Sequence, residues 1–191
     1  MKEEIKKLEL IQEDFEHFID LIYKKHKSAN REVIFAAMII KKTNDILSSA
    51  IHTLKNYVIS VQISLLRLMC DNCLAIQSAM ELGLNKYIEM IDSNQKINTV
   101  MIDEEQAMTD GYLKRLVAKT YKGFDKLYNF ACESVHFSKQ ALTNTVIKEN
   151  EILKLNVKPG NKELKKEIIS NNAQMITLCK VIKDMLKRIC L

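Results

Sequence analysis

The chain has 191 residues, of which 47% are hydrophobic and 28% are charged, and this composition excludes an intrinsically disordered protein. Four Gly and one Pro among many helix-forming residues favour an all-α fold, and the length favours a single helical-bundle domain over residues 1–191. The net charge of +5 permits contact with an anionic partner but is too small to indicate one. We therefore expect an up-and-down bundle of five to seven helices.

The N-terminal part of the sequence predicts long helices. Over residues 3–27, apolar residues recur at intervals of three and four, which is typical of an amphipathic helix. Asn30 is suited to cap the next helix, because its side-chain oxygen can accept a hydrogen bond from a free backbone N–H group. Residues 31–82 contain neither Gly nor Pro. We expect two helices there with a break near residues 52–56, and one long bent helix is the alternative.

The middle of the sequence predicts a short helix and a loop. Gly83 weakens the helical pattern, and residues 84–92 resume it for a short helix. Residues 93–108 are rich in Ser, Asn, Asp and Glu and predict a loop. Thr109 and Asp110 are then suited to cap a further helix.

The C-terminal part combines helices with a small β-hairpin. A helical pattern continues after Gly123, a predicted joint, to about residue 135. Residues 144–158 contain a stretch in which apolar and polar residues alternate, and this period of two predicts a hairpin that turns near Glu149–Asn150. Asn161 is expected to cap a final helix that runs to the C-terminus.

The cysteines and the apolar runs indicate a cytoplasmic protein without membrane contact. Five cysteines, an odd number, lie within apolar helical patterns, which is typical of a reduced intracellular protein rather than a disulfide scaffold. The stretch "MKEEIKKLEL" at residues 1–10 has no apolar core and does not resemble a signal peptide. The longest apolar run, "VIFAAMII" at residues 33–40, is far shorter than the roughly 20 residues of a membrane-spanning helix.

The sequence predicts neither a metal site nor a cofactor. Cys70 and Cys73 have the spacing of a metal-ligand pair, but no second Cys or His pair follows at a suitable distance. Such cysteines within a helix are typical of small buried hydrophobic residues. Residues 103–105 form an acidic loop in which nothing fixes the geometry that a metal requires.

A narrow polar stripe marks the helix predicted over residues 57–82. At 100° per residue one side of this helix carries Ser60, Ser64, Arg67, Asp71 and Ser78. Most of its remaining circumference is apolar, which is typical of a central bundle helix. Burying Arg67 alone would cost several kcal/mol, so Asp71, one turn later, is its expected partner. The pair is either a half-exposed structural salt bridge or part of a functional cleft.

The segment "YNFACESVHFS" at residues 128–138 carries the second candidate. On a helix, Asn129, Glu133 and His136 gather on the side opposite the apolar residues. Acidic and amide neighbours would raise the pKa of His136 and orient its ring, which suits a general acid or base or an anion contact. The alternative is a helix-end histidine that is favoured by the helix dipole.

These two segments resemble an uncharacterised family of bacterial helical proteins. "LLRLMCDN" at residues 65–72 and "YNFACESVHFS" resemble that family's Arg-x-x-x-Glu helix and its Tyr-x-x-Leu-Ser-x-x-Val-His-Pro-Ser segment. The layout is similar to that of the HEPN superfamily of nucleotide-associated and RNA-cleaving bundles. The resemblance implies one site made by Arg67, Asp71, Tyr128 and His136.

The sequence departs from the family pattern in four positions and in one motif. Asp71 replaces Glu, Ala131 replaces Leu, Cys132 replaces Ser and Phe137 replaces Pro. The HEPN ribonuclease signature, an Arg followed after four to six residues by a His, is missing. The resemblance therefore leaves open whether the chain is an enzyme.

Two hypotheses about function follow. In the first, a HEPN-like bundle binds RNA, a nucleotide or another phosphate-bearing ligand in a cleft formed by Arg67, Asp71 and His136, which are also the candidate catalytic residues. Tyr128, Asn129 and Glu133 are then the candidate ligand-binding residues. In the second, the chain is a non-enzymatic helical interaction protein, and a homodimer is one form it could take; the same residues then form a structural polar network.

Overall fold

The fold is an all-α bundle, as predicted. The computed structural model describes residues 1–103, 106–135, 146–149, 152–155 and 164–191. These residues contain seven α-helices: α1 (Lys2–His26), α2 (Arg31–Asn56), α3 (Ile59–Leu82), α4 (Leu84–Asp92), α5 (Asp110–Thr120), α6 (Phe124–Val135) and α8 (Lys165–Cys190).

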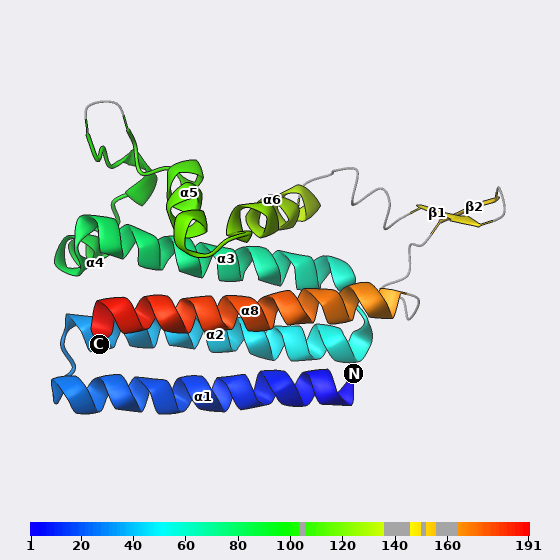
Figure 1. Ribbon diagram of the computed structural model, residues 1–191, viewed down its shortest axis with the longest axis horizontal. Helices are drawn as coiled ribbons and strands as arrows, with labels where there is room; N and C mark the ends of the chain where they lie inside the picture. Colours follow the sequence, from blue (N-terminus) through cyan, green and yellow to red (C-terminus); the bar gives the residue numbers. More distant parts are fainter. Residues whose placement is uncertain (104–105, 136–145, 150–151, 156–163) are drawn as a thin grey trace.

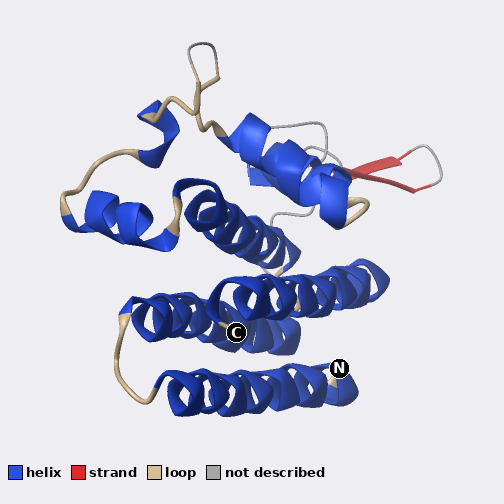
Figure 2. Cartoon of the chain, turned by 60° about the vertical axis from the view of Figure 1, so that its left-hand side comes forward, coloured by secondary structure: helices blue, strands red, loops and turns tan. Residues whose placement is uncertain are grey.

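Four long helices, α1, α2, α3 and α8, lie side by side and form the body of the bundle (Figures 1 and 2). α1, α2 and α3 alternate in direction, whereas α8 runs in the same direction as α1. The carbonyl oxygen of Leu191, just beyond α8, accepts a hydrogen bond from Lys25 near the end of α1. α5 and α6 pack on α3, on the side that faces away from α1 (Figure 1).

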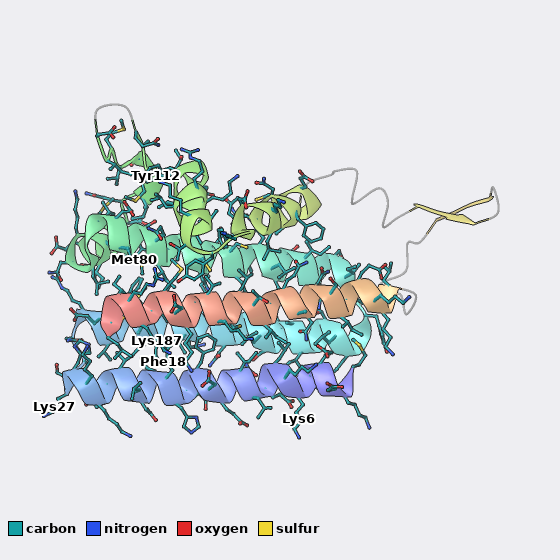
Figure 3. The ribbon with its side chains drawn as sticks, in the orientation of Figure 1. Lys6, Phe18, Lys27, Met80, Tyr112 and Lys187 are labelled. Carbon is teal, nitrogen blue, oxygen red and sulfur yellow. The ribbon has the colours of Figure 1, made fainter. Side chains whose placement is uncertain are left out.

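Hydrophobic side chains on facing helices fill the interior. Figure 3 shows this on α1, where Phe18 points toward the neighbouring helices and Lys6 points away from them. Phe18 and Leu8 on α1 are buried, as is Met175 on α8. Each buried side chain of this size contributes on the order of 2 kcal/mol through removal of apolar surface from water.

The predicted caps and breaks between the long helices are confirmed. The Oδ1 atom of Asn30 accepts a hydrogen bond from the backbone N–H of Val33 at 3.1 Å and caps α2. α2 and α3 are separate helices, and the break follows the predicted region by one residue, at Tyr57, whose φ of 56° is left-handed. Gly83 ends α3 with a φ of 78°, a conformation that glycine adopts without steric cost.

The predicted loop over residues 93–108 contains some regular structure. It includes a short 3₁₀ helix, Ile97–Thr99, and an antiparallel bridge between Met101 and Ala107. Thr109 then caps α5 by accepting a hydrogen bond from the backbone N–H of Tyr112, as predicted.

The predicted hairpin is present. Strand β1 (Val146–Glu149) pairs in antiparallel register with β2 (Ile152–Leu155), and Glu149 lies opposite Ile152. The final helix α8 runs from Lys165 to Cys190, with Leu164 at its N-cap position. Asn161, the predicted cap, lies outside the described residues.

Helix α3 is the central helix. By length and composition it is the one helix among the described residues that could span a membrane, with a mean hydropathy of 1.4, and 61% of its apolar window is buried inside the bundle. This burial explains its apolar composition, because α2, α6 and α8 all pack against it.

The predicted polar stripe on α3 is only partly correct. Ser78 is buried, because its hydroxyl donates to the carbonyl oxygen of Leu74 on the same helix and so needs no water. Conversely, Val61 and Leu68, on the apolar part of the helix, are 46% and 41% exposed.

Buried amide side chains connect the helices of the bundle. Gln62 on α3 donates to the carbonyl oxygen of Ile168 on α8 at 3.1 Å. Asn172 on α8 donates to the carboxylate of Glu4 on α1 at 2.7 Å. Because a buried polar group without a partner costs free energy, these bonds favour one alignment of α1, α3 and α8.

Candidate functional site

Arg67 is the centre of a polar cluster where α3, α5 and α6 meet. Its Nε atom donates a hydrogen bond to Sγ of Cys132 at 2.9 Å. Its Nη2 atom donates to the hydroxyl of Tyr128 at 2.5 Å and to Oδ2 of Asp110 at 3.2 Å. Its Nη1 atom forms an ion pair with the carboxylate of Asp71. Nε and Nη2 therefore donate hydrogen bonds within the chain, whereas Nη1 is buried, forms no hydrogen bond with a described residue and is held by the ion pair alone.

Tyr128 supports this guanidinium in two ways. The carbon of the Arg67 guanidinium lies 4.2 Å from the centre of the Tyr128 ring, within the range of a cation–π contact. The Tyr128 hydroxyl accepts from Arg67 and donates to Oδ2 of Asp110 at 2.8 Å. Burial, reinforced by this bond to Asp110, raises the pKa of Tyr128, so the phenol stays protonated at neutral pH.

The cluster is assembled from three pairs of residues, each spaced by one helical turn. The pairs are Arg67 and Asp71 on α3, Asp110 and Lys114 on α5, and Tyr128 and Cys132 on α6. Residues four apart on a helix lie on the same face, so each helix presents two side chains to the same place. The Nζ atom of Lys114 lies 5.4 Å from the Tyr128 ring centre and closes the cluster on the α5 side.

The charges of the cluster nearly cancel. The side chain of Arg67 is 19% exposed, and it is paired with Asp71 and Asp110, which are 34% and 60% exposed. Two carboxylates beside one guanidinium leave no surplus of positive charge, and the nearby ammonium of Lys114 brings the local sum to about zero.

Three of the predicted site residues come together, and two others do not. Arg67, Asp71 and Tyr128 belong to the cluster, as predicted from the sequence. Asn129 and Glu133 lie on the exposed side of α6, and in the described part of the chain neither forms a hydrogen bond with Arg67. Both are exposed because the α6 face carrying Tyr128 is the one that packs on α3. Asn129 instead accepts a hydrogen bond from Lys114 at 2.8 Å.

His136 lies outside the described residues. Its position relative to Arg67, and with it the predicted contact to Glu133 and Asn129, stays a prediction.

Three members of the cluster, Asp110, Lys114 and Cys132, were not among the predicted site residues. Asp110 was expected only as part of a helix start, and 43 residues separate it from Arg67. No local pattern indicates that α5 crosses α3 at this point. Cys132 had a usable signal, because it lies one turn after Tyr128 on the same face of α6.

The remaining cysteines are packed as hydrophobic residues, as predicted for Cys70 and Cys73. Both are fully buried in α3, and burial raises the pKa of Cys70 to about 12. Burial raises the pKa of Cys73 as well. Across the described residues, no group of three or more His, Cys, Asp or Glu side chains is arranged to hold a metal ion.

Comparisons with known proteins do not place the chain in a family. No family model matches the sequence, no curated protein matches it, and no solved structure matches the fold.

Proposed function

We propose that the chain is a non-enzymatic helical interaction protein in which the Arg67 cluster is a structural joint. The observation that carries this proposal is that Asp110, Tyr128 and Cys132, on α5 and α6, accept hydrogen bonds from the guanidinium, which also forms an ion pair with Asp71 on α3. An arginine in such a position fixes α5 and α6 on α3, because its bonds reach both helices at once. The bundle then presents the outer surfaces of these helices in a fixed arrangement.

The charge balance of the cluster also favours this proposal over phosphate binding. For Arg67 to anchor a phosphate, its guanidinium would have to leave two carboxylates that already lie beside it. If the guanidinium left these two carboxylates for a phosphate, it would gain little electrostatic energy, because it would only replace one set of anionic partners with another. Asp71 and Asp110 would also be left without their cation. Binding of RNA or a nucleotide through Arg67, Asp71 and His136 is the competing hypothesis.

A binding screen with matched variants tests the proposal. Fluorescence anisotropy with a labelled single-stranded RNA, and calorimetry with ATP, are measured for wild type, Arg67→Met and His136→Ala. Arg115→Met is the control, because Arg115 is an exposed arginine on α5. Neither Arg67→Met nor His136→Ala should change binding by more than the control does, and Arg67→Met should lower the melting temperature.

The opposite result would overturn the proposal. If wild type binds RNA or ATP, and Arg67→Met or His136→Ala abolishes that binding while circular dichroism shows an intact helical fold, the cluster is a ligand site. The control separates this outcome from a general loss of positive charge.

A further inference from the structure

An apolar groove runs between α6 and α8, away from the Arg67 cluster. Its volume is about 560 Å³, which falls within the range of ligand and peptide sites. Its lining comes from α6 with the turn before it and from α8, and includes Lys122, Phe124, Lys126, Leu127, Gln174 and Val181.

The groove exists because α6 and α8 pack on α3 and make few contacts with each other (Figure 1). Buried Phe124 and Leu178 form its floor. Leu127 and Val181, which are half-buried, form its two walls. The α8 wall runs from Gln174 to Val181, about 10 Å at the rise of an α-helix, so the groove matches about two turns of another helix.

The rim of the groove is positively charged. Lys122 and Lys126 line it and are exposed, and no acidic residue among those that the structure describes belongs to its lining. Among the described residues neither lysine is part of an ion pair, in contrast to Lys183, which pairs with Asp14. Their ammonium groups are therefore available to a partner that carries carboxylates next to an apolar face.

Gln174 supplies a second polar feature in the wall. Its Oε1 atom is buried, and no hydrogen-bond donor reaches it in the part of the chain that the structure describes. A buried acceptor without a donor is energetically unfavourable, so a partner that brings an N–H group into the groove would recover part of that cost. A purely hydrocarbon ligand has no such donor, which favours a polypeptide.

We propose that this groove binds an amphipathic helix of a partner protein, with an apolar face flanked by Asp and Glu. Apolar side chains at positions i, i+4 and i+7 of that helix fill the space between Leu127 and Val181. Its acidic residues pair with Lys122 and Lys126 at the rim. This inference rests on the proposed interaction function, and it names the surface and the partner chemistry through which that function acts.

Binding of designed peptides to the full chain tests the inference. The probe is a fluorescein-labelled helical peptide of about 12 residues, with leucines on one face and glutamates beside them; its matched control carries lysines in place of the glutamates. The acidic peptide should bind at least about tenfold more tightly than the basic one, because the rim charge favours it. Raising the salt concentration should narrow that difference.

Three variants locate the binding site. Val181→Glu places a carboxylate in the apolar wall, Thr177→Glu places one at the exposed lip, and the double variant Lys122→Glu/Lys126→Glu reverses the rim charge. Each variant should lower the affinity for the acidic peptide by about tenfold or more. Thr177 and the two lysines are exposed, so these variants keep the fold even if Val181→Glu does not. Val61→Glu, at an exposed apolar position on α3, is the control and should leave binding unchanged.

Several outcomes would overturn the inference. Equal affinity for the acidic and basic peptides would show that the lysines at the rim do not select the partner. Unchanged affinity in both Thr177→Glu and the double lysine variant would show that the peptide binds outside the groove. If sedimentation shows that wild type self-associates and that Thr177→Glu makes it monomeric, the occupant is a second copy of this chain. Loss of RNA binding in Arg67→Met would instead count against the proposed function alone, because that cluster is separate from the groove.

Discussion

Replacing Arg67 with methionine should destabilise the protein by about 2–3 kcal/mol, because it removes every contact of the guanidinium and keeps much of the side-chain stem. The ion pairs with Asp71 and Asp110 involve carboxylates that are 34% and 60% exposed, so solvent screening limits each to roughly 0.5 kcal/mol. The hydrogen bond to Tyr128 and the stacking on its ring are largely buried and contribute about 1 kcal/mol each. For a chain of this length, the melting temperature should fall by roughly 5–10 °C.

Urea unfolding followed by far-ultraviolet circular dichroism measures this change. Arg67→Lys should lie between wild type and Arg67→Met, because lysine keeps the charge but cannot reach acceptors on both α5 and α6. Arg115→Met, on the exposed side of α5, should stay within about 0.5 kcal/mol of wild type. If Arg67→Met also stays within that margin, the cluster does not hold α5 and α6 on α3, and the structural role assigned to it is wrong.

Two further predictions concern a thiol and a carboxylate. Cys132 should react first with a thiol reagent under native conditions, because it is partly exposed and the other four cysteines are buried; a fast-reacting thiol that persists in Cys132→Ser would contradict this. The pKa of the Glu4 carboxyl is lowered from 4.5, mainly by the hydrogen bond from Lys7 and further by the hydrogen bond from Asn172. The ionised carboxylate therefore contributes fully to stability above the unfolded-state pKa, and this contribution is lost as the pH falls through the lower folded-state pKa. The difference in unfolding free energy between wild type and Glu4→Gln should therefore shrink below about pH 4.5, and a difference that stays constant from pH 7 to pH 3 would refute the reasoning.

The helices were predictable because their signals are local. The cap at Asn30, the glycine at position 83 and the intervals of three and four residues depend only on neighbours within a turn or two. The hairpin was predictable for the same reason, since Val146 and Leu155 belong to one short stretch of chain.

The candidate site was predictable only within each helix. Arg67 and Asp71 are one turn apart on α3, so their pairing follows from the sequence. The same reasoning selected Asn129 and Glu133, since a polar face of α6 is visible in the pattern, but the pattern does not state which neighbour each face meets.

The sequence by itself determined where most helices begin and end and which of their faces are broadly apolar, because these properties depend on residues close together in the chain. Only the tertiary structure decided that Asp110, 43 residues after Arg67, completes the cluster, because that contact depends on how α5 crosses α3. The groove between α6 and α8 has the same origin: Leu127 and Val181 form facing walls only because both helices pack on α3. Local periodicity fixes the faces of a helix, whereas the packing of whole helices fixes which faces meet.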